Sequence, residues 1–309
     1  MALSATELQD QNRSEVPTQS VTNTAWGGLI AKCSNTKQNF TLPQWTTLNE
    51  FHGILAEESI GLKNGNDFTL KYFGIGIRGA DAIGKTGLGT TLLKVNQHQP
   101  KDGNLFVPIP FACRPVDSDF NTVNRAKYRM RTVEDINGVA YAFYWLKVIN
   151  FASYNPQVVV ITRDDDNNET PVPYIPVKDD LFNPQPVDFT STGSVPISNQ
   201  YMNNSAILDC SLDQTDLREM ENACRVKYGD ASLAAPNEVG VAYGIDTKTD
   251  GSIGQGATIR YDEVLSAVYA HYITERDARA ALNNVRIQYA FDHGASEPML
   301  LHTNATTGA

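Results

Sequence analysis

The residues most suggestive of chemistry lie in a glycine-rich stretch, FGIGIRGADAIGKTG, at residues 73–87. Residues 79–86 match the phosphate-binding pattern G-x-x-x-x-G-K-T, in which backbone amides hold the phosphates. In that pattern Lys85 would reach the outer phosphates and Thr86 would bind magnesium. Residues 74–79 also match the dinucleotide-binding pattern G-x-G-x-x-G. Either match is meaningful only if the surrounding elements are those of a nucleotide-binding fold.

The surrounding sequence argues against both patterns. A phosphate-binding loop joins a buried parallel strand to a helix whose N-terminus faces the phosphates. Here Gly87 and Gly89 would fall in the first turn of that helix, where each is disfavoured by about 1 kcal/mol relative to Ala. The chain then continues into QHQPKDG and a proline-rich run. A dinucleotide site would also need an acidic residue at the end of a second parallel strand, which is missing. We therefore interpret the stretch as a flexible or interface loop.

The other residues that could do chemistry are scattered. Asp164, Asp166 and Asn168 imitate the start of a calcium-binding EF-hand loop, but Glu169 stands where glycine is required and Ile175 where the bidentate glutamate should be. The four cysteines form no C-x-x-C pair, and the five histidines form no H-x-x-x-H pair. No G-x-S-x-G elbow occurs. We expect reduced core thiols, no enzyme activity, no metal and no cofactor.

Four basic residues alternate along one predicted strand, so their side chains should emerge on one face. This cationic ridge fits a solvated sheet face neutralised by nearby aspartates, a contact with an acidic neighbouring subunit, or nucleic acid. The formal net charge of −10 argues against nucleic acid and makes a partner contact reasonable. With two glycines of the loop, the ridge forms a candidate interface: Arg125, Lys127, Arg129, Arg131, Gly79 and Gly84.

Size and composition indicate a folded protein. The 309 residues can bury a sizeable core and suit one large domain or two ordinary ones. Charged residues make up 19% and hydrophobic residues 41%. The N-terminal stretch has no basic region followed by an apolar run, and no segment is long and apolar enough to cross a bilayer. We expect neither a secretory signal nor a membrane partner, and no small-molecule substrate.

Periodicity predicts mostly strands in the first two thirds of the chain. Asn137-Gly138 is a residue pair favoured in two-residue β-turns, so it predicts a hairpin in which opposite residue numbers sum to 275. Arg131 would then face Tyr144, and Met130 would face Trp145. Residues 158–162 and 170–177 predict a second hairpin, blunted by prolines. Further strands are expected at 68–77, 90–95 and 285–291.

Helices are expected mostly in the C-terminal third. The strongest is 211–229, where Ser211 and Gln214 form a capping-box pattern and Gly229 ends the helix. Apolar residues at helical spacing predict further helices at 261–273 and 275–282. The fold class is therefore mainly β with a few helices (α+β), with antiparallel sheets and a β-sandwich-like core.

Four regions are expected along the chain: a flexible N-terminal arm at 1–24, a β-rich domain at 25–180, a connection at 181–205, and an α+β region at 206–309 that packs on the same body. The proline-, asparagine- and serine-rich composition of residues 181–205 indicates the connection.

Two parts of the chain carry a resemblance. The run NLFVPIPFACRPVDSDFNTVNRAKYRMR followed by AYAFYWLKVI, and the C-terminal ATIRYDEVLSAVYAHYITERDARAALNNVRIQYAF before DHGASEPML, resemble virion structural proteins of large tailed bacteriophages. The likeness covers roughly residues 60–160 and 255–300. It implies a copy in a symmetric particle, in the tail, baseplate or neck, assembled in the host cytoplasm with copies of itself and other virion proteins.

Three alternatives remain open at this point. A major capsid or capsid-decorating protein is the first rival, although a major capsid protein usually has a long spine helix. A P-loop enzyme would bind nucleotide. A carbohydrate- or receptor-binding β module would show exposed aromatic side chains on a concave face, and Trp26, Trp45 and Trp145 are too far apart in sequence to decide this.

Overall fold

The computed structural model describes residues 18–85, 87, 91–164, 168–184, 197–204, 206–252, 258–279 and 286–300. The chain forms two units. The first comprises Met1–Ile149 and Ser211–Gln288, and the second comprises Asn150–Cys210 and Tyr289–Ala309. This division differs from the boundaries expected at residues 180 and 206, because the chain leaves the first unit directly after the long central hairpin.

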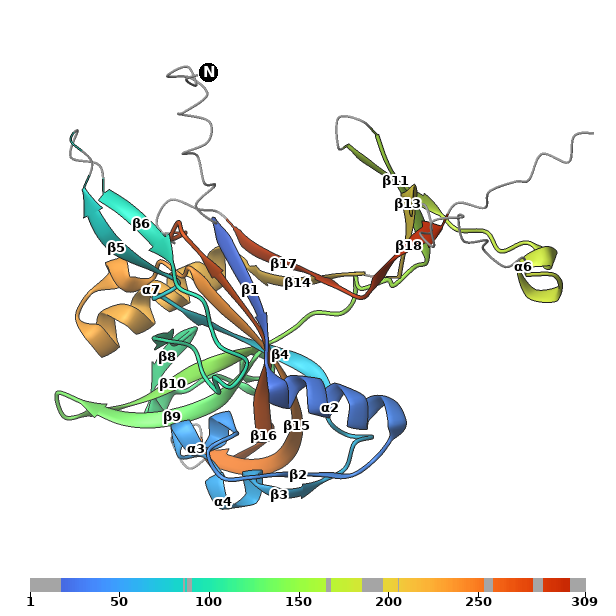
Figure 1. Cartoon of the computed structure of the whole chain (residues 1–309). Helices are drawn as coiled ribbons and strands as arrows, with labels where there is room; N and C mark the ends of the chain where they lie inside the picture. The colour runs from blue at the N-terminus through green and yellow to red at the C-terminus, as the bar shows by residue number, and fades with distance from the viewer. Residues whose placement is uncertain are drawn as a thin grey trace, which may run out of the picture. The chain divides into compact units, whose positions relative to one another are not determined.

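An antiparallel sheet of eight strands organises the first unit (Figure 1). Its main path runs β1-β16-β15-β4-β10-β8, while β7 pairs with β4 and β9 pairs with β10. The strands are β1 (Gln19–Asn23), β4 (Thr69–Gly76), β7 (Pro108–Ile109), β8 (Ala112–Pro115), β9 (Tyr128–Ile136), β10 (Val139–Val148), β15 (Glu238–Ser252) and β16 (Thr258–Glu275). The predicted fold class, mostly β with antiparallel sheets, is confirmed.

The β9–β10 hairpin has the predicted turn and register. Asn137 and Gly138 both have positive φ, 55° and 82°, as a two-residue turn of the predicted type requires. Arg131 pairs with Tyr144, as predicted, so opposite residue numbers sum to 275. Met130 has a φ of 59° and is not in register with a partner on β10, which interrupts the ladder where Trp145 was expected to face it.

The predicted helix at 261–273 is wrong, because these residues belong to strand β16. β16 is buried on both faces over most of this stretch, so its apolar residues do not alternate with polar ones. A continuous apolar run of this kind fits a helix and a buried strand equally well by spacing alone. The segment is rich in Val, Tyr and Ile, which favour strands. Residues 275–279 of the next predicted helix are not helical either, and 280–282 lie outside the described residues.

The N-terminal region is more ordered than expected. Residues 1–17 of the predicted arm lie outside the described residues, but β1 pairs with β16 along its whole length. Thr24 then caps helix α2 (Ala25–Thr36), since its side chain accepts a hydrogen bond from the backbone N–H of Gly27. The prediction of a flexible arm is therefore wrong for residues 19–23, which belong to the sheet.

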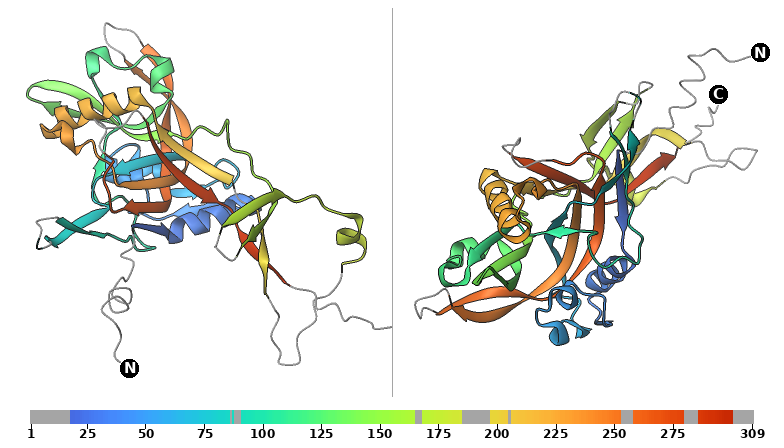
Figure 2. Two further views of the ribbon diagram at one scale, coloured as in Figure 1. Left: turned by 90° about the horizontal axis from the view of Figure 1, so that it is seen from above. Right: turned by 90° about the vertical axis from the view of Figure 1, so that its left-hand side faces the viewer.

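Most described helices lie outside the C-terminal third, which corrects the expected placement. They are α2, α3 (Leu48–His52), α4 (Ala56–Ser59), α5 (Thr122–Arg125), α6 (Lys178–Phe182) and α7 (Gln214–Tyr228), with short 3₁₀ turns at Val116–Ser118 and Ala231–Leu233. Helices α2, α3 and α4 lie against β16, and α7 lies against β8 (Figure 2).

Helix α7 was predicted within a few residues. Gly229 ends it in a left-handed conformation, as expected. The cap is formed by Asp213 and Asp216, however, and not by Ser211 and Gln214. Asp213 accepts from the N–H groups of the first turn, and Asp216 accepts from the N–H of Asp213.

Among the described residues, the core of the first unit includes a larger and a smaller hydrophobic cluster. The larger one joins side chains from α3, α7 and the sheet, including Tyr72, Phe143, Trp145 and Tyr272. The smaller one packs Ile30 of α2 and strand β2 (Phe40–Leu42), which pairs with β3 (Gly61–Lys63), against Val268 of β16. Burial of these large side chains supplies most of the driving force for folding.

The glycine-rich stretch belongs to two strands, β4 and β5 (Ala80–Lys85), with residues 77–79 between them. β4 ends at Gly76, and β5 pairs antiparallel with β6 (Thr91–Val95). Residues 86 and 88–90 lie outside the described residues. Because the next described element is a strand, the arrangement differs from a phosphate-binding loop, which leads into a helix.

The second unit contains an antiparallel four-stranded sheet in the order β12-β11-β13-β18. Its strands are β11 (Val159–Arg163), β12 (Glu169–Pro173), β13 (Ile197–Asn203) and β18 (Ser296–Leu300). The predicted proline-blunted hairpin is β11–β12. The expected connection at 181–205 contains β13 and is therefore partly structured. A separate two-stranded sheet is formed by β14 (Ala206–Leu212) and β17 (Ile287–His293), and the latter confirms the predicted last strand.

Candidate functional site: an aromatic groove

The four basic residues of the predicted ridge do not share one strand face. Arg125 ends helix α5, Lys127 precedes β9, and Arg129 and Arg131 lie in β9. Arg125 is 2% exposed and Arg129 is 6% exposed, whereas Lys127 is exposed and Arg131 is half-buried. The expectation of four side chains on one solvated face is therefore wrong, because α5 turns the chain before β9 begins.

Aspartates of the same chain neutralise the buried part of this ridge. Arg131 Nε donates to Asp119 Oδ2 at 2.9 Å, and Arg125 Nη1 lies 4.0 Å from the same oxygen. Arg129 Nε donates to Asp246 Oδ1 at 3.2 Å. These guanidinium groups form an internal network, so a contact with a neighbouring subunit stays a prediction for Lys127 and the half-buried Arg131.

The two glycines of the predicted interface have different surroundings. Gly79 N–H donates to the Asn237 side chain at 2.8 Å, and a Cβ on Gly79 would lie 2.0 Å from the Asn237 carbonyl oxygen. Gly79 is therefore required for close packing inside the first unit. Gly84 lies in β5 with a φ of +155°, and a Cβ there would meet nothing within 4 Å. Its role at an interface stays a prediction.

A groove of about 510 Å³ in the first unit is the strongest candidate for a binding site. We name it the aromatic groove. Its apolar lining is contributed by five separate parts of the chain: Phe51, Phe106, Pro108, Val133, Trp145 and Tyr228. Large apolar side chains gathered at an open depression are typical of ligand and partner sites.

Secondary structure holds most of the groove lining, whereas Phe106 and Val107 lie outside the helices and strands. Helix α3 supplies Phe51 and His52, and Gly53 ends this helix in a left-handed conformation. Neighbouring strands β9 and β10 supply Thr132–Glu134 and Trp145. The last turn of α7 supplies Lys227 and Tyr228. Most of the lining therefore lies on helices and strands of the main fold, which favours a preformed site.

The charges at the groove cancel each other. Lys227 Nζ donates to both carboxylate oxygens of Glu134, at 2.6 and 2.5 Å. The ammonium group also lies over the rings of Phe143, Trp145 and Tyr228, at 5.0, 5.1 and 5.7 Å from their centroids. Cation–π contacts and the ion pair hold Lys227 in the wall.

His52 adds no charge at neutral pH. Its ring centroid lies 4.9 Å from that of Trp145, and 4.8 Å from that of Phe51. Burial, aided by the positive charge of Lys227, lowers the pKa of His52 from 6.5 to about 3. The groove is therefore uncharged overall between pH 5 and 8.

Several polar atoms of the lining are already engaged within the wall. Trp145 Nε1 donates to Thr132 Oγ1 at 2.8 Å, and the Tyr228 hydroxyl donates to the Pro108 carbonyl at 3.3 Å. The groove consequently offers shape and apolar surface more than hydrogen bonds. Such a surface suits aliphatic side chains and prolines better than hydroxyl-rich molecules.

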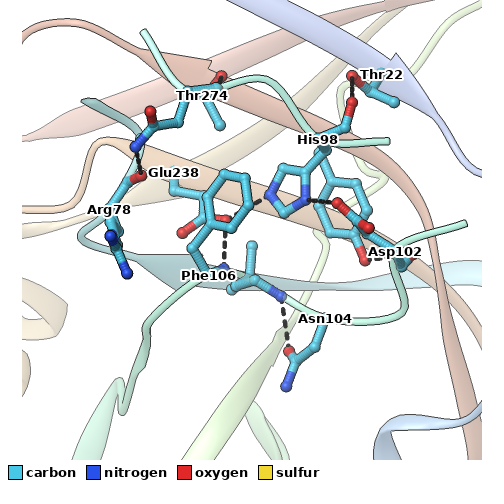
Figure 3. Close-up of polar contacts among 12 residues, drawn as sticks. Thr22, Arg78, His98, Asp102, Asn104, Phe106, Glu238 and Thr274 are labelled. Atoms are coloured by element: carbon cyan, nitrogen blue, oxygen red, sulfur yellow. Dashed lines mark hydrogen bonds and ion pairs between the residues drawn. The ribbon is translucent and has the colours of Figure 1, made fainter. Parts of the chain in front are cut away.

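A buried hydrogen-bonded cluster centred on His98 positions one wall of the groove (Figure 3). His98 Nε2 lies 2.6 Å from Glu238 Oε1, and His98 Nδ1 lies 3.1 Å from Asp102 Oδ2. The imidazole is stacked between the rings of Phe106 and Tyr272, at 3.9 Å from each centroid. Phe106 N–H donates to Glu238 Oε1 at 2.8 Å. The cluster therefore fixes both the ring and the backbone of Phe106.

The His98 cluster resembles the acid and base of a catalytic triad, but its geometry is structural. A triad histidine bonds a carboxylate through one nitrogen and keeps the other for the nucleophile. Here both ring nitrogens face carboxylates, and His98 and Glu238 are 2% and 0% exposed. Among the residues described, no group of three His, Cys, Asp or Glu side chains could hold a metal ion.

Sequence reasoning missed both the groove and the cluster. His98 and Glu238 are 140 positions apart, and the groove combines residues from 51 to 228. The predicted hairpin register includes Trp145, but it gives no indication of the helix ends that flank Trp145 in the groove. Only the tertiary fold brings these residues together.

Comparison with known proteins assigns the chain to a family. The model described as "Family of unknown function (DUF7208)" matches residues 10–308. The chain belongs to this family. The match spans residues of both units. No curated protein and no solved structure matches the chain. Within the described ranges, no helix has the length and apolar character needed to cross a membrane.

Proposed function

We propose that the chain is a structural component of a tailed-bacteriophage virion, in the tail, baseplate or neck, and acts through contacts between subunits. The observation that carries this proposal is the number of large apolar side chains that face solvent in both units. The strongest in the second unit are Ile175, Leu181 and Phe182, which are 80%, 77% and 73% exposed. Exposed apolar surface of this extent is typical of protein contacts.

The first unit also has an exposed apolar region. The β5–β6 hairpin presents Ile83 and Leu92, which are 62% and 45% exposed. This is the glycine-rich region expected to touch a neighbour. The resemblance of the chain to tailed-phage virion proteins supplies the kind of particle, and the proposed location is the virion after assembly in the host cytoplasm. Partners would be copies of the chain and other virion proteins.

A major capsid protein is the first alternative. Capsid subunits usually contain a long spine helix, whereas α7, the longest helix described, has 15 residues and α2 has 12. A helix of 15 residues is about 22 Å long. This comparison favours the tail, baseplate or neck over the capsid shell.

A receptor- or carbohydrate-binding module is the second alternative, and the aromatic groove favours it. Trp145 and Tyr228 both line the depression, although only Tyr228, at 38% exposure, presents much of its ring, while Trp145 is 7% exposed. Sugar binding also needs hydrogen-bonding groups that point at the ligand. Because the polar atoms of Trp145, Tyr228 and Lys227 are engaged in the wall, the groove fits an apolar protein segment better.

Immunogold electron microscopy of intact particles tests the proposal. Antibodies against the chain should label the tail, baseplate or neck of particles purified from the native source. Labelling of the capsid shell would support the first alternative. Particles without label, together with a strong signal in the soluble host fraction, would contradict a virion role.

A further inference from the structure

The second unit carries an exposed segment that is uncharged and rich in proline. Residues 170–177 read TPVPYIPV and contain no charged residue. We name this segment the proline strip. Val172, Ile175 and Val177 are 54%, 80% and 60% exposed. An uncharged, apolar and exposed segment is expected to be covered by a partner.

The backbone of the proline strip restricts how a partner can bind it. Its first residues belong to β12, which lies at the end of the four-stranded sheet and pairs with β11. Pro171 and Pro173 have no N–H to donate, so they oppose extension of the sheet by another strand. Prolines also hold the preceding residues in an extended conformation. Contacts with the strip must therefore come mainly from side chains.

The proline strip and the aromatic groove are complementary in chemistry. Extended segments with prolines dock in grooves lined by aromatic rings, because little conformational entropy is lost on binding. The charges of Lys227 and Glu134 are paired with each other, and the strip brings no charge of its own. Binding would therefore leave no unpaired charge buried.

We propose that the aromatic groove of one copy binds the proline strip of a second copy. This inference rests on the proposed function, because it names one contact by which subunits assemble. The two surfaces are different, so the contact is head-to-tail. Contacts of this type produce closed rings or open filaments, and do not stop at a dimer.

Two substitutions test the groove and the strip one at a time. Val133→Glu places a charge in the groove at a position that is 51% exposed, and Ile175→Glu places a charge on the strip. Leu62→Glu is the matched control, since Leu62 is 71% exposed in β3 and belongs to neither surface. Because all three side chains are exposed, the variants should fold, and circular dichroism with thermal melting verifies this.

Sedimentation velocity of the full chain over a range of concentrations is the measurement. We expect the wild type and Leu62→Glu to form species larger than a dimer. Val133→Glu and Ile175→Glu should each raise the apparent dissociation constant by about tenfold or more, as loss of a central apolar contact does. An equimolar mixture of these two variants should form 1:1 dimers. In that mixture one intact groove meets one intact strip, and growth then stops.

Three results would overturn the inference: a wild type that stays monomeric, groove and strip variants that associate as the wild type does, or a mixture that remains monomeric while the wild type assembles. These results are distinct from failure of the proposed function. A chain that is present in virions but fails the mixing test retains its virion role through other contacts. A chain that passes the mixing test but is absent from virions assembles elsewhere.

Discussion

His52 offers a test of how well the aromatic groove excludes water. Its folded-state pKa is lowered to about 3, whereas in the unfolded chain it is about 6.5. As the pH falls below 6.5, the unfolded state therefore binds a proton that the folded state does not bind. The contribution of His52 to the free energy of unfolding is therefore fully present above pH 6.5 and is lost progressively as the pH falls toward 3.

The size of this effect follows from the shift. At pH 5, about 1.5 units below the unfolded-state pKa, protonation of His52 stabilises the unfolded state but not the folded state. This lowers the free energy of unfolding by about 2 kcal/mol. Partial contact of the ring with solvent lowers the expected value to about 1–2 kcal/mol. His52→Phe keeps a ring against Trp145 and Phe51 but removes the titration.

Urea unfolding at pH 8, 6.5 and 5 measures the effect as a difference between the two proteins. Other titrating groups contribute nearly equally to both, so the wild type should lose about 1–2 kcal/mol more than His52→Phe between pH 8 and pH 5. Parallel curves, with a difference below about 0.5 kcal/mol, would show that His52 titrates as a solvated histidine. That result would refute the burial of a neutral His52 in the groove wall.

Three further predictions concern the fold, the cysteines and nucleotide binding. Gly27→Ala should destabilise the chain by about 1–3 kcal/mol, because its Cβ would lie 2.4 Å from Ala270 Cα. Gly28→Ala, which meets nothing within 4 Å, should stabilise α2 by about 0.5–1 kcal/mol; equal effects of the two changes in urea unfolding would refute the packing of α2 on β16. A thiol reagent should modify only Cys33 in the native chain and all four cysteines in urea, since the other three are buried; rapid modification of a second thiol would contradict this. Calorimetry with magnesium ATP or GTP should show no binding by the wild type or Lys85→Ala, and a micromolar affinity lost in the variant would restore the phosphate-loop interpretation.

The sequence predicted those elements that are determined by nearby residues. Asn137-Gly138 specified the β9–β10 turn, and the turn in turn specified the register down to the pairing of Tyr128 with Lys147. Gly229 specified the end of α7. In each of these cases a local backbone requirement, a positive φ, decides the structure, and only a few residue types satisfy it.

The errors came where tertiary packing decides. The stretch at 261–273 has apolar residues at helical spacing, but it pairs with β1 and β15 as a strand, and it is buried on both faces. The basic residues from Arg125 to Arg131 have the spacing of one exposed strand face. In the structure, however, the first of them belongs to α5, and the buried Asp119 binds guanidinium groups of this row inside the chain. The groove could not be predicted because its walls meet only in the folded chain.

Quantitative mass spectrometry of gradient-purified particles from the native source tests the central claim most directly. If the chain is a structural component of the virion, its peptides should co-migrate with intact particles in a fixed number of copies per particle. That number should remain constant through further purification and high-salt washing. Peptides that are lost on washing, or that occur only in the soluble host fraction, would contradict the account.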